Sequence, residues 1–178
     1  MDSDERFTSF VREHTQALLK TAYLLTRNAS EAEELVQDTL AWLYPRWQQV
    51  ESAEHQLPYV RKAVVNRFLA GKRRLSSTEV FFDAARERAS DRPVIRDRTA
   101  EVDERIALWS QLGELSERQR AALVLRFFHD LPDDEVAGVL ECRVGTVRSL
   151  ISRALSTLRA TGDFADDAVS ARYLRNVT

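Results

Sequence analysis

Apolar residues recur at helical spacing near the start of the chain and predict two consecutive helices. The first is expected from about Glu5 to Thr26. Its apolar stripe comprises Phe7, Phe10, Val11, Leu18, Ala22 and Leu25. Ser30 followed by Glu33 has the form of a capping box, which predicts a second helix running toward Trp47. The stripe of that helix comprises Leu35, Val36, Leu40 and Leu43.

A third helix is predicted after a polar stretch from Gln48 to Gln56. Pro45 should end or kink the second helix, whereas Pro58 suits the first turn of the third. The third helix would end in Lys72-Arg73-Arg74, and its buried face would comprise Val60, Val64 and Phe68. We expect the three helices to share one core.

The helical pattern weakens in a charged stretch, residues 76–103, which we interpret as a linker. Its only apolar cluster, Val80 with Phe81 and Phe82, would either pack on the first domain or dock on a partner. Periodicity resumes with Val102, Ile106, Trp109 and Leu112.

This second periodic region breaks at Gly113, and a further possible capping box follows from Ser116 to Gln119. The helix that follows carries Leu123, Val124, Phe127 and Phe128. We expect the tail, residues 161–178, to be frayed or loosely docked.

Two helices separated by a short turn come next and have the layout of a helix-turn-helix. Leu131-Pro132-Asp133 turns the chain into a helix from Asp134 to Leu140, and four residues later a last helix runs from about Gly145 to Ala160. Ala137 and Gly138 would allow the two helices to cross closely. The residues expected to point inward are Val136, Leu140, Val144, Val147 and Ile151.

Composition favours a folded helical protein of the cytoplasm. Hydrophobic residues make up 44% and charged residues 30% of the 178 residues, with only 5 Gly and 4 Pro. The first residues lack the pattern of an export signal, and no apolar run is long enough to enter a membrane. Cys142 is the single cysteine, so an internal disulfide is excluded.

Charge is unevenly distributed, although the formal net charge is only −2. Between Gln56 and Thr78 there are six basic residues and no acid, and Cys142 to Gly162 holds four arginines and no acid. Between Asn28 and Pro45 the bias reverses to four acids and no base. This distribution suggests two contacts with nucleic acid and one separate contact with protein.

The last helix could place basic and hydroxyl side chains in a DNA major groove. Arg148 or Arg153 could contact a guanine through two hydrogen bonds, and Arg159 with the hydroxyls could hold phosphates. The candidate groove-facing residues are Arg143, Thr146, Arg148, Ser149, Ser152 and Arg153.

This second half resembles the carboxy-terminal domain of bacterial σ factors, specifically the extracytoplasmic function (ECF) group. The resemblance rests on Leu115-Ser116-Glu117-Arg118-Gln119-Arg120, Leu123 to Phe128, and Glu141 to Ser149. It implies that residues 104–160 are σ region 4, which reads the minus-35 promoter element and lies against the β flap of RNA polymerase. Glu141 departs from the pattern, because relatives often carry glycine there; a left-handed backbone would cost about 1 kcal/mol.

The first half independently resembles σ region 2, which the likeness assigns to residues 1–75. The segment Ala32 to Leu40 is similar to the helix that binds the clamp helices of the β′ subunit. An acidic helix would complement a basic polymerase surface. The candidate polymerase-binding residues are Glu33, Glu34, Gln37 and Asp38.

The third helix is similar to the segment that meets the minus-10 element. Asn66 stands where the family carries its characteristic asparagine, and the loop from Gln48 to Leu57 is the expected pocket for an unstacked base. The remaining candidates for this DNA contact are Arg61, Lys62, Lys72, Arg73 and Arg74. The resemblance also makes an anti-σ factor a plausible partner, although no residue identifies one.

Two other classes of function were weighed. A response regulator or quorum-sensing regulator also ends in a helix-turn-helix, but the first 75 residues lack the alternating strands of a receiver domain. An enzyme is not expected: no Gly-rich phosphate loop or metal-ligand spacing occurs, and His14, His55 and His129 are far apart in the sequence. We therefore expect no catalytic residue, metal or cofactor. Cys142 could be a redox sensor, but such a cysteine is more often a packing residue.

Overall fold

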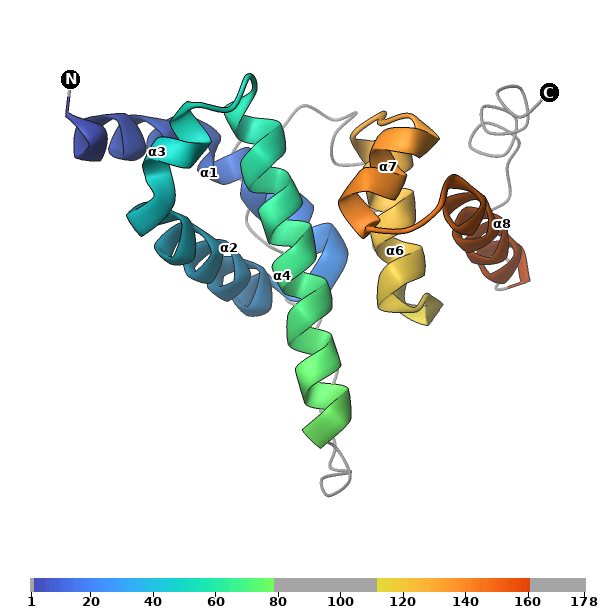
Figure 1. Cartoon of the computed structure of the whole chain (residues 1–178). Coiled ribbons are helices and arrows are strands. Elements are labelled where there is room, and N and C mark those ends of the chain that lie inside the picture. The colour runs from blue at the N-terminus through green and yellow to red at the C-terminus, as the bar shows by residue number, and fades with distance from the viewer. Residues whose placement is uncertain (1, 79–111, 161–178) are drawn as a thin grey trace, which may run out of the picture. The chain divides into compact units, whose positions relative to one another are not determined.

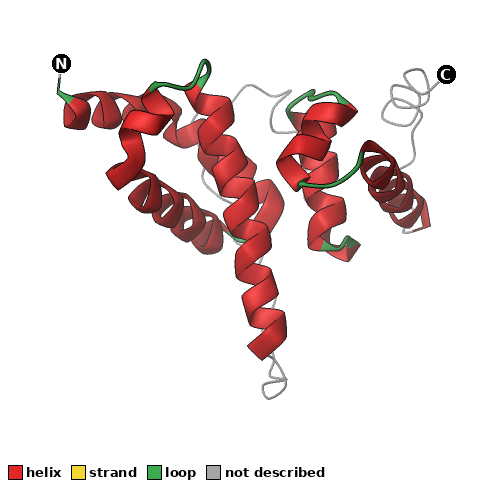
Figure 2. Cartoon of the chain, in the orientation of Figure 1, coloured by secondary structure: helices red, strands yellow, loops and turns green. Residues whose placement is uncertain are grey.

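The computed structural model describes residues 2–78 and 112–160, and every regular element within them is helical (Figure 2). The chain divides into two compact units, residues Met1–Asp103 and Glu104–Thr178. The predicted all-α class is therefore confirmed. Among the described residues, no helix is both long and apolar enough to cross a membrane.

The first unit is a bundle in which α1, α2 and α4 pack against one another in pairs (Figure 1). Its elements are α1 (Ser3–Thr26), α2 (Ala29–Leu43), η1 (Tyr44–Arg46), α3 (Trp47–Glu51) and α4 (Gln56–Thr78). The core takes side chains from all four α-helices, and its fully buried members include Leu18, Leu25, Leu43, Val50, Val60 and Val64. The apolar stripes predicted for these helices thus meet in one core.

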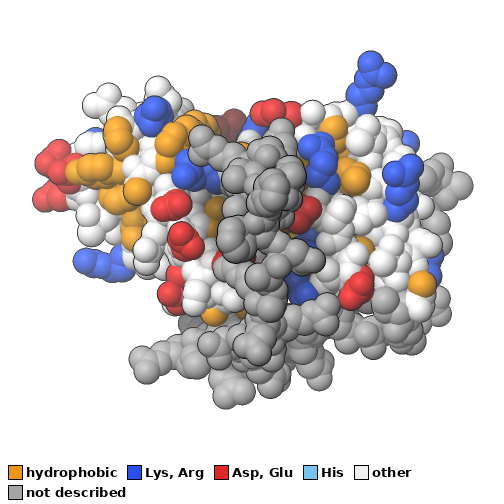
Figure 3. All heavy atoms as spheres, turned by 90° about the horizontal axis from the view of Figure 1, so that it is seen from below, with side chains coloured by type: hydrophobic (Ala, Val, Ile, Leu, Met, Phe, Trp, Pro, Cys, Tyr) orange, Lys and Arg blue, Asp and Glu red, His pale blue; other side chains and the backbone are white. Residues whose placement is uncertain are grey.

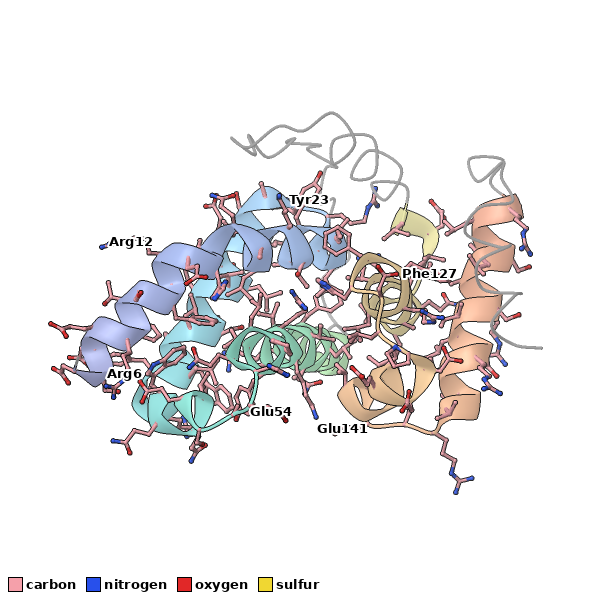
Figure 4. The ribbon with its side chains drawn as sticks, turned by 90° about the horizontal axis from the view of Figure 1, so that it is seen from above. Arg6, Arg12, Tyr23, Glu54, Phe127 and Glu141 are labelled. Carbon is pink, nitrogen blue, oxygen red and sulfur yellow. The ribbon has the colours of Figure 1, made fainter. Side chains whose placement is uncertain are left out.

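Contacts at the start of the chain attach α1 to the segment after α2. The Arg6 side chain, labelled in Figure 4, pairs with Glu51 of α3, with Nε 2.8 Å from Oε1. The hydrogen bond from Arg6 lowers the pKa of the Glu51 carboxyl from its ordinary value. The Tyr44 hydroxyl donates to Asp4 at 2.9 Å. These contacts place η1 and α3 beside the first turns of α1.

Two boundaries in the first unit differ from the sequence prediction, and a third agrees with it. The capping box expected at Ser30 is wrong, because Asn28 caps α2: its backbone is extended and its Oδ1 accepts the Glu31 N–H at 3.0 Å. Pro45 does end α2, within η1. The stretch from Gln48 is not a continuous loop, since α3 runs to Glu51 and only residues 52–55 separate it from α4.

The second unit is smaller and is built around α8. Its elements are η2 (Leu112–Glu114), α6 (Glu117–Leu123), the π-helical turn η3 (Val124–Phe128), α7 (Asp133–Leu140) and α8 (Val144–Ala160). Both α6 and α7 pack on α8. The predicted capping box at Ser116 and Gln119 is confirmed.

A buried arginine, Arg120, links two elements of this unit. The Arg120 side chain is 9% exposed, and it donates hydrogen bonds to the carbonyl oxygens of Leu112 and Leu115, at 3.2 and 3.0 Å. A buried guanidinium needs such acceptors, because an unpaired buried donor costs about 1–3 kcal/mol. These bonds attach η2 to α6.

Several sequence predictions lie outside the described residues. These include the apolar cluster at Val80, the stripe from Val102 to Trp109, most of the linker and the tail. Residues Lys72, Arg73 and Arg74 belong to α4, which continues past them to Thr78, but their side chains are not described.

Candidate nucleic-acid interface

The helix-turn-helix consists of α7, a three-residue turn and α8. The face of α8 that packs against α6 and α7 is buried and comprises Val147, Ile151, Ala154, Leu155 and Leu158. The opposite face is exposed, and it carries all six predicted groove-facing residues: Arg143 in the turn, then Thr146, Arg148, Ser149, Ser152 and Arg153. Figure 3 shows arginine side chains, coloured blue, at the surface of this unit. An exposed basic and hydroxyl face is suited to phosphates and base edges.

The turn between the helices depends on a strained residue. Glu141, labelled in Figure 4, has φ 50° and ψ 51°, and its N–H bonds to the Ala137 carbonyl. A side chain in this left-handed region costs about 1–2 kcal/mol, which glycine would avoid. The geometry anticipated from the sequence is therefore present, with glutamate in the glycine-favouring position.

The roles expected for two small residues of α7 are only half right. Ala137 is buried where the helices meet. Gly138 is exposed, and a Cβ added there would meet no atom within 4 Å. The prediction that Gly138 permits the close crossing is wrong, because its position on α7 faces away from α8.

Arg148 is the one predicted groove-facing arginine with a recorded ion pair among the described residues. Its Nε donates to Asp133 Oδ2 at 3.1 Å. Asp133 is the first residue of α7, and its other oxygen, Oδ1, lies 3.3 Å from Arg126 Nε in η3, an ion pair whose two atoms have no hydrogen-bond partner among the described residues. Asp133 was not predicted from the sequence, where its only signal was an acid at the start of the helix that precedes α8.

The four predicted polymerase-binding residues lie on the surface of α2. Glu33, Glu34, Gln37 and Asp38 are all exposed, and among the described residues no hydrogen bond or ion pair is recorded for any of them. Spacings of three and four residues place them on one face of the helix. This acidic face is thus available to a partner.

Trp42 extends the acidic face by one turn and was not predicted. Its side chain is 44% exposed, and it follows Glu34 and Asp38 at intervals of four residues. The Arg46 guanidinium carbon lies 5.0 Å from the centroid of the indole ring, and that of Arg67 in α4 lies 5.8 Å away. The signal in the sequence was a large aromatic residue outside the apolar stripe of α2.

The described candidates on α4 are not equally exposed. Lys62 is exposed, Asn66 is half-buried, and Arg61 is half-buried, with an enclosed Nε that has no hydrogen-bond partner among the described residues. Burial lowers the pKa of Arg61 from its ordinary value. The pocket expected from Gln48 to Leu57 is wrong in extent, because helices occupy both ends of that segment and leave a loop of residues 52–55.

Groups that would indicate metal chemistry were also sought. Over residues 2–78 and 112–160, no three His, Cys, Asp or Glu side chains are grouped so that they could hold a metal ion. Cys142 is half-buried in the turn of the helix-turn-helix.

Comparison with known proteins finds similarity that extends over both units. Residues 105–158 match the family described as sigma-70, region 4. The chain is 31% identical over 153 residues to RNA polymerase sigma-E factor of Streptomyces coelicolor, covering 86% of this chain and 84% of that protein. It is 29% identical to ECF RNA polymerase sigma factor SigE of Mycolicibacterium smegmatis, covering 84% of this chain and 58% of that protein.

Solved structures show the same fold. The sigma factor RpoE of Bartonella quintana, solved in complex with the anti-sigma factor NepR, aligns with a TM-score of 0.65 at 23% identity, covering 91% of this chain and 99% of that one. CnrH, solved in complex with the cytosolic domain of CnrY, aligns with a TM-score of 0.58 at 21% identity, covering 92% and 91% of the two chains.

Proposed function

This chain belongs to the RNA polymerase sigma factors of the ECF type and serves in transcription initiation, and we propose how its described surfaces divide that work. Its relatives are named sigma factors, so a response-regulator or quorum-sensing role is not favoured. The proposal assigns promoter reading to α8, polymerase binding to α2 and contact with the minus-10 element to α4.

The exposed face of α8 is the observation that carries the proposal. Six polar or basic residues cover the solvent side of a helix whose other side is fully packed. Such a helix can enter a major groove without losing core contacts. We assign this face to the minus-35 element and the remainder of residues 104–160 to the β flap.

The acidic face of α2 is assigned to the clamp helices of the β′ subunit. Its carboxylates are exposed and make no recorded contact within the described residues, so they can approach a basic surface without breaking internal bonds. Trp42 belongs to the same contact, because it lies one turn beyond Asp38 and aromatic anchors dominate many interfaces.

The basic residues of α4 are assigned to the minus-10 element. Lys62 is exposed toward solvent, and the half-buried Arg61 adds a second positive charge one residue before it. Asn66, Lys72, Arg73 and Arg74 complete this proposed contact, which should weaken steeply with salt.

The proposed partners are core RNA polymerase, promoter DNA and an anti-sigma factor. Support for the last comes from one structural neighbour, a sigma factor solved with its anti-sigma factor. The protein would act in the cytoplasm, where its polymerase and promoters are found.

In-vitro transcription tests the proposal. Bacterial core polymerase is supplied with a pool of genomic promoter fragments, with and without this protein, and transcript starts are sequenced. We expect discrete starts that depend on the protein and share two upstream motifs. Absence of such starts, together with absence of binding to core polymerase, would overturn the assignment.

A further inference from the structure

We propose that Asp133 is a positioning residue that fixes the direction in which Arg148 enters the DNA groove. This inference rests on the proposed role of α8 in reading the minus-35 element. It adds a residue of α7, outside the recognition helix, to those that determine which bases are preferred. Two observations carry the inference. The Asp133 carboxylate contacts both Arg126 and Arg148, and Arg126 is largely buried whereas Arg148 is exposed.

The carboxylate of Asp133 is held on its inner side. Its side chain is 16% exposed, and Oδ1 lies 3.3 Å from Nε of Arg126, which is itself only 14% exposed. Asp133 also begins α7, where the positive end of the helix dipole favours a negative charge. Asp133 is thus placed by partial burial, by the charge of Arg126 and by the helix dipole, although Asp133 Oδ1 and Arg126 Nε have no hydrogen-bond partner among the described residues.

The outer side of the carboxylate holds Arg148, whose side chain is 54% exposed. The bond of 3.1 Å is made by Nε, which lies at the base of the guanidinium group. The two terminal nitrogens of the guanidinium therefore remain available as a fork. A fork of this kind matches the O6 and N7 acceptors of guanine in the major groove.

The net charge of the cluster of Arg126, Asp133 and Arg148 indicates that Asp133 orients Arg148 and does not cancel its positive charge. Asp133 faces two arginines, so the negative charge that would cancel Arg148 is already offset by Arg126. The three side chains together keep one net positive charge, and Arg148 is the exposed residue that carries it. Arg148 accordingly keeps its attraction for DNA while its side chain loses conformational freedom before binding, which reduces the entropy cost of the contact.

The other two arginines of the face provide a contrast. Arg143 and Arg153 are exposed, and among the described residues neither has a recorded acceptor. Arginines without an internal acceptor suit phosphates, which carry no sequence information, whereas an arginine oriented by a neighbouring acid suits a base edge. Arg148 is therefore the arginine of this face that the structure prepares for selective reading.

The test compares base preference in variants of the full chain bound to core polymerase. A promoter identified by in-vitro transcription is randomised across its minus-35 element, and the transcripts are sequenced to give a preference at each position. Arg148→Ala should abolish preference at one position, by on the order of 10-fold or more. Asp133→Asn should reduce preference at that same position by about 3- to 10-fold and leave the other positions unchanged.

Two controls separate positioning from structural damage. Asp134→Asn removes an exposed acid next in sequence and should leave every preference unchanged. Arg148→Lys retains the charge and the native Asp133 but lacks the fork, so it should lose the same preference while the salt dependence of promoter binding stays within about one ion of the parent. The double variant Asp133→Asn with Arg148→Ala should match Arg148→Ala alone.

The outcomes distinguish the inference from the function on which it rests. Positioning is overturned if Asp133→Asn leaves the Arg148-dependent preference intact, or if it strengthens binding to all sequences equally, as removal of a masking charge would. If Arg148→Ala itself alters no preference, the placement of α8 in the groove fails, and positioning fails with it. If the parent protein directs no transcription, the proposed function fails.

Discussion

The charged faces of α2 and α8 are both exposed, but they differ in how their side chains are held. On α2, the four polymerase-facing candidates make no recorded contact within the described residues. On α8, Arg148 is bound to an acid that a second, half-buried arginine holds in place. One surface carries charges that have no recorded partner among the described residues, and the other contains a charge paired with a neighbouring acid.

This difference corresponds to two kinds of recognition. Mobile charges on a helix face give long-range attraction and fast association, and they tolerate variation in the partner surface. Selecting one base pair among four requires donors at fixed positions and angles. We therefore expect changes on α2 to alter affinity for polymerase, and changes around Asp133 to alter the choice of promoter.

Replacing Arg126 with alanine should give the largest effect, a loss of about 2 kcal/mol in the stability of the second unit. The substitution leaves Asp133 without its inner partner and opens space beside η3. Hydrogen exchange of the amides in α6 to α8 would measure the loss. Arg143→Ala, which removes an exposed arginine, should change exchange by less than about 0.5 kcal/mol; equal effects of the two substitutions would contradict the buried role of Arg126.

Removing the Trp42 side chain should weaken binding to core polymerase by about 1–2 kcal/mol, or roughly 5- to 30-fold. The cause is loss of an exposed aromatic anchor beside the acidic face. Binding is measured with DNA absent, by titrating labelled protein with core polymerase. Tyr59→Ala, which removes another exposed aromatic residue from a different helix, is the control, and an equal loss there would show that the effect is not specific to the α2 face.

Asp38→Ala should weaken the same complex by about 0.5–1 kcal/mol, because one mobile surface charge contributes less than an aromatic anchor. The loss should appear mainly in the association rate and should shrink as salt is raised. Stopped-flow mixing at two ionic strengths measures both effects. A loss that is independent of salt would argue against an electrostatic role for this face, and Arg148→Ala should leave the rate unchanged.

Glu141→Gly should have the smallest effect and the opposite sign, a gain of about 0.5–1 kcal/mol in the second unit. Glycine relieves the left-handed backbone, although it also increases the freedom of the unfolded chain. Hydrogen exchange in α7 and α8 would report the gain. Glu141→Ala retains the Cβ atom and should therefore give no gain in stability. If alanine does stabilise the second unit, the effect comes from removing the glutamate charge and not from relieving the backbone.

The elements of the fold could be predicted where each depends on its own residues. The stripe of Val60, Val64 and Phe68 defines the buried side of α4, because helical spacing alone brings these residues onto one face. The capping box at Ser116 was predictable for the same reason, since its partners are three residues apart. The start of α2 was misplaced because two polar residues, Asn28 and Ser30, could each serve as the cap, and the backbone conformation chose between them.

The candidate site was predictable only in part. All six residues predicted to face a groove are exposed in the helix-turn-helix, as the period of α8 requires. Gly138 was misassigned because a small residue is compatible with a close crossing but does not require one. Trp42 was missed because a stripe identifies the residues that are buried and says little about how the remaining residues serve a partner.

The sequence by itself determined the helical class, the two periodic regions, the opposed charge of their exposed faces and the resemblance to sigma factors. These properties follow from the composition and from the spacing of residues that are close together in the sequence. Only the tertiary structure decided that Asp133 holds Arg148 and is held by Arg126. Residues 126, 133 and 148 belong to three different elements, and the packing of η3, α7 and α8 is what brings their charges within bonding distance.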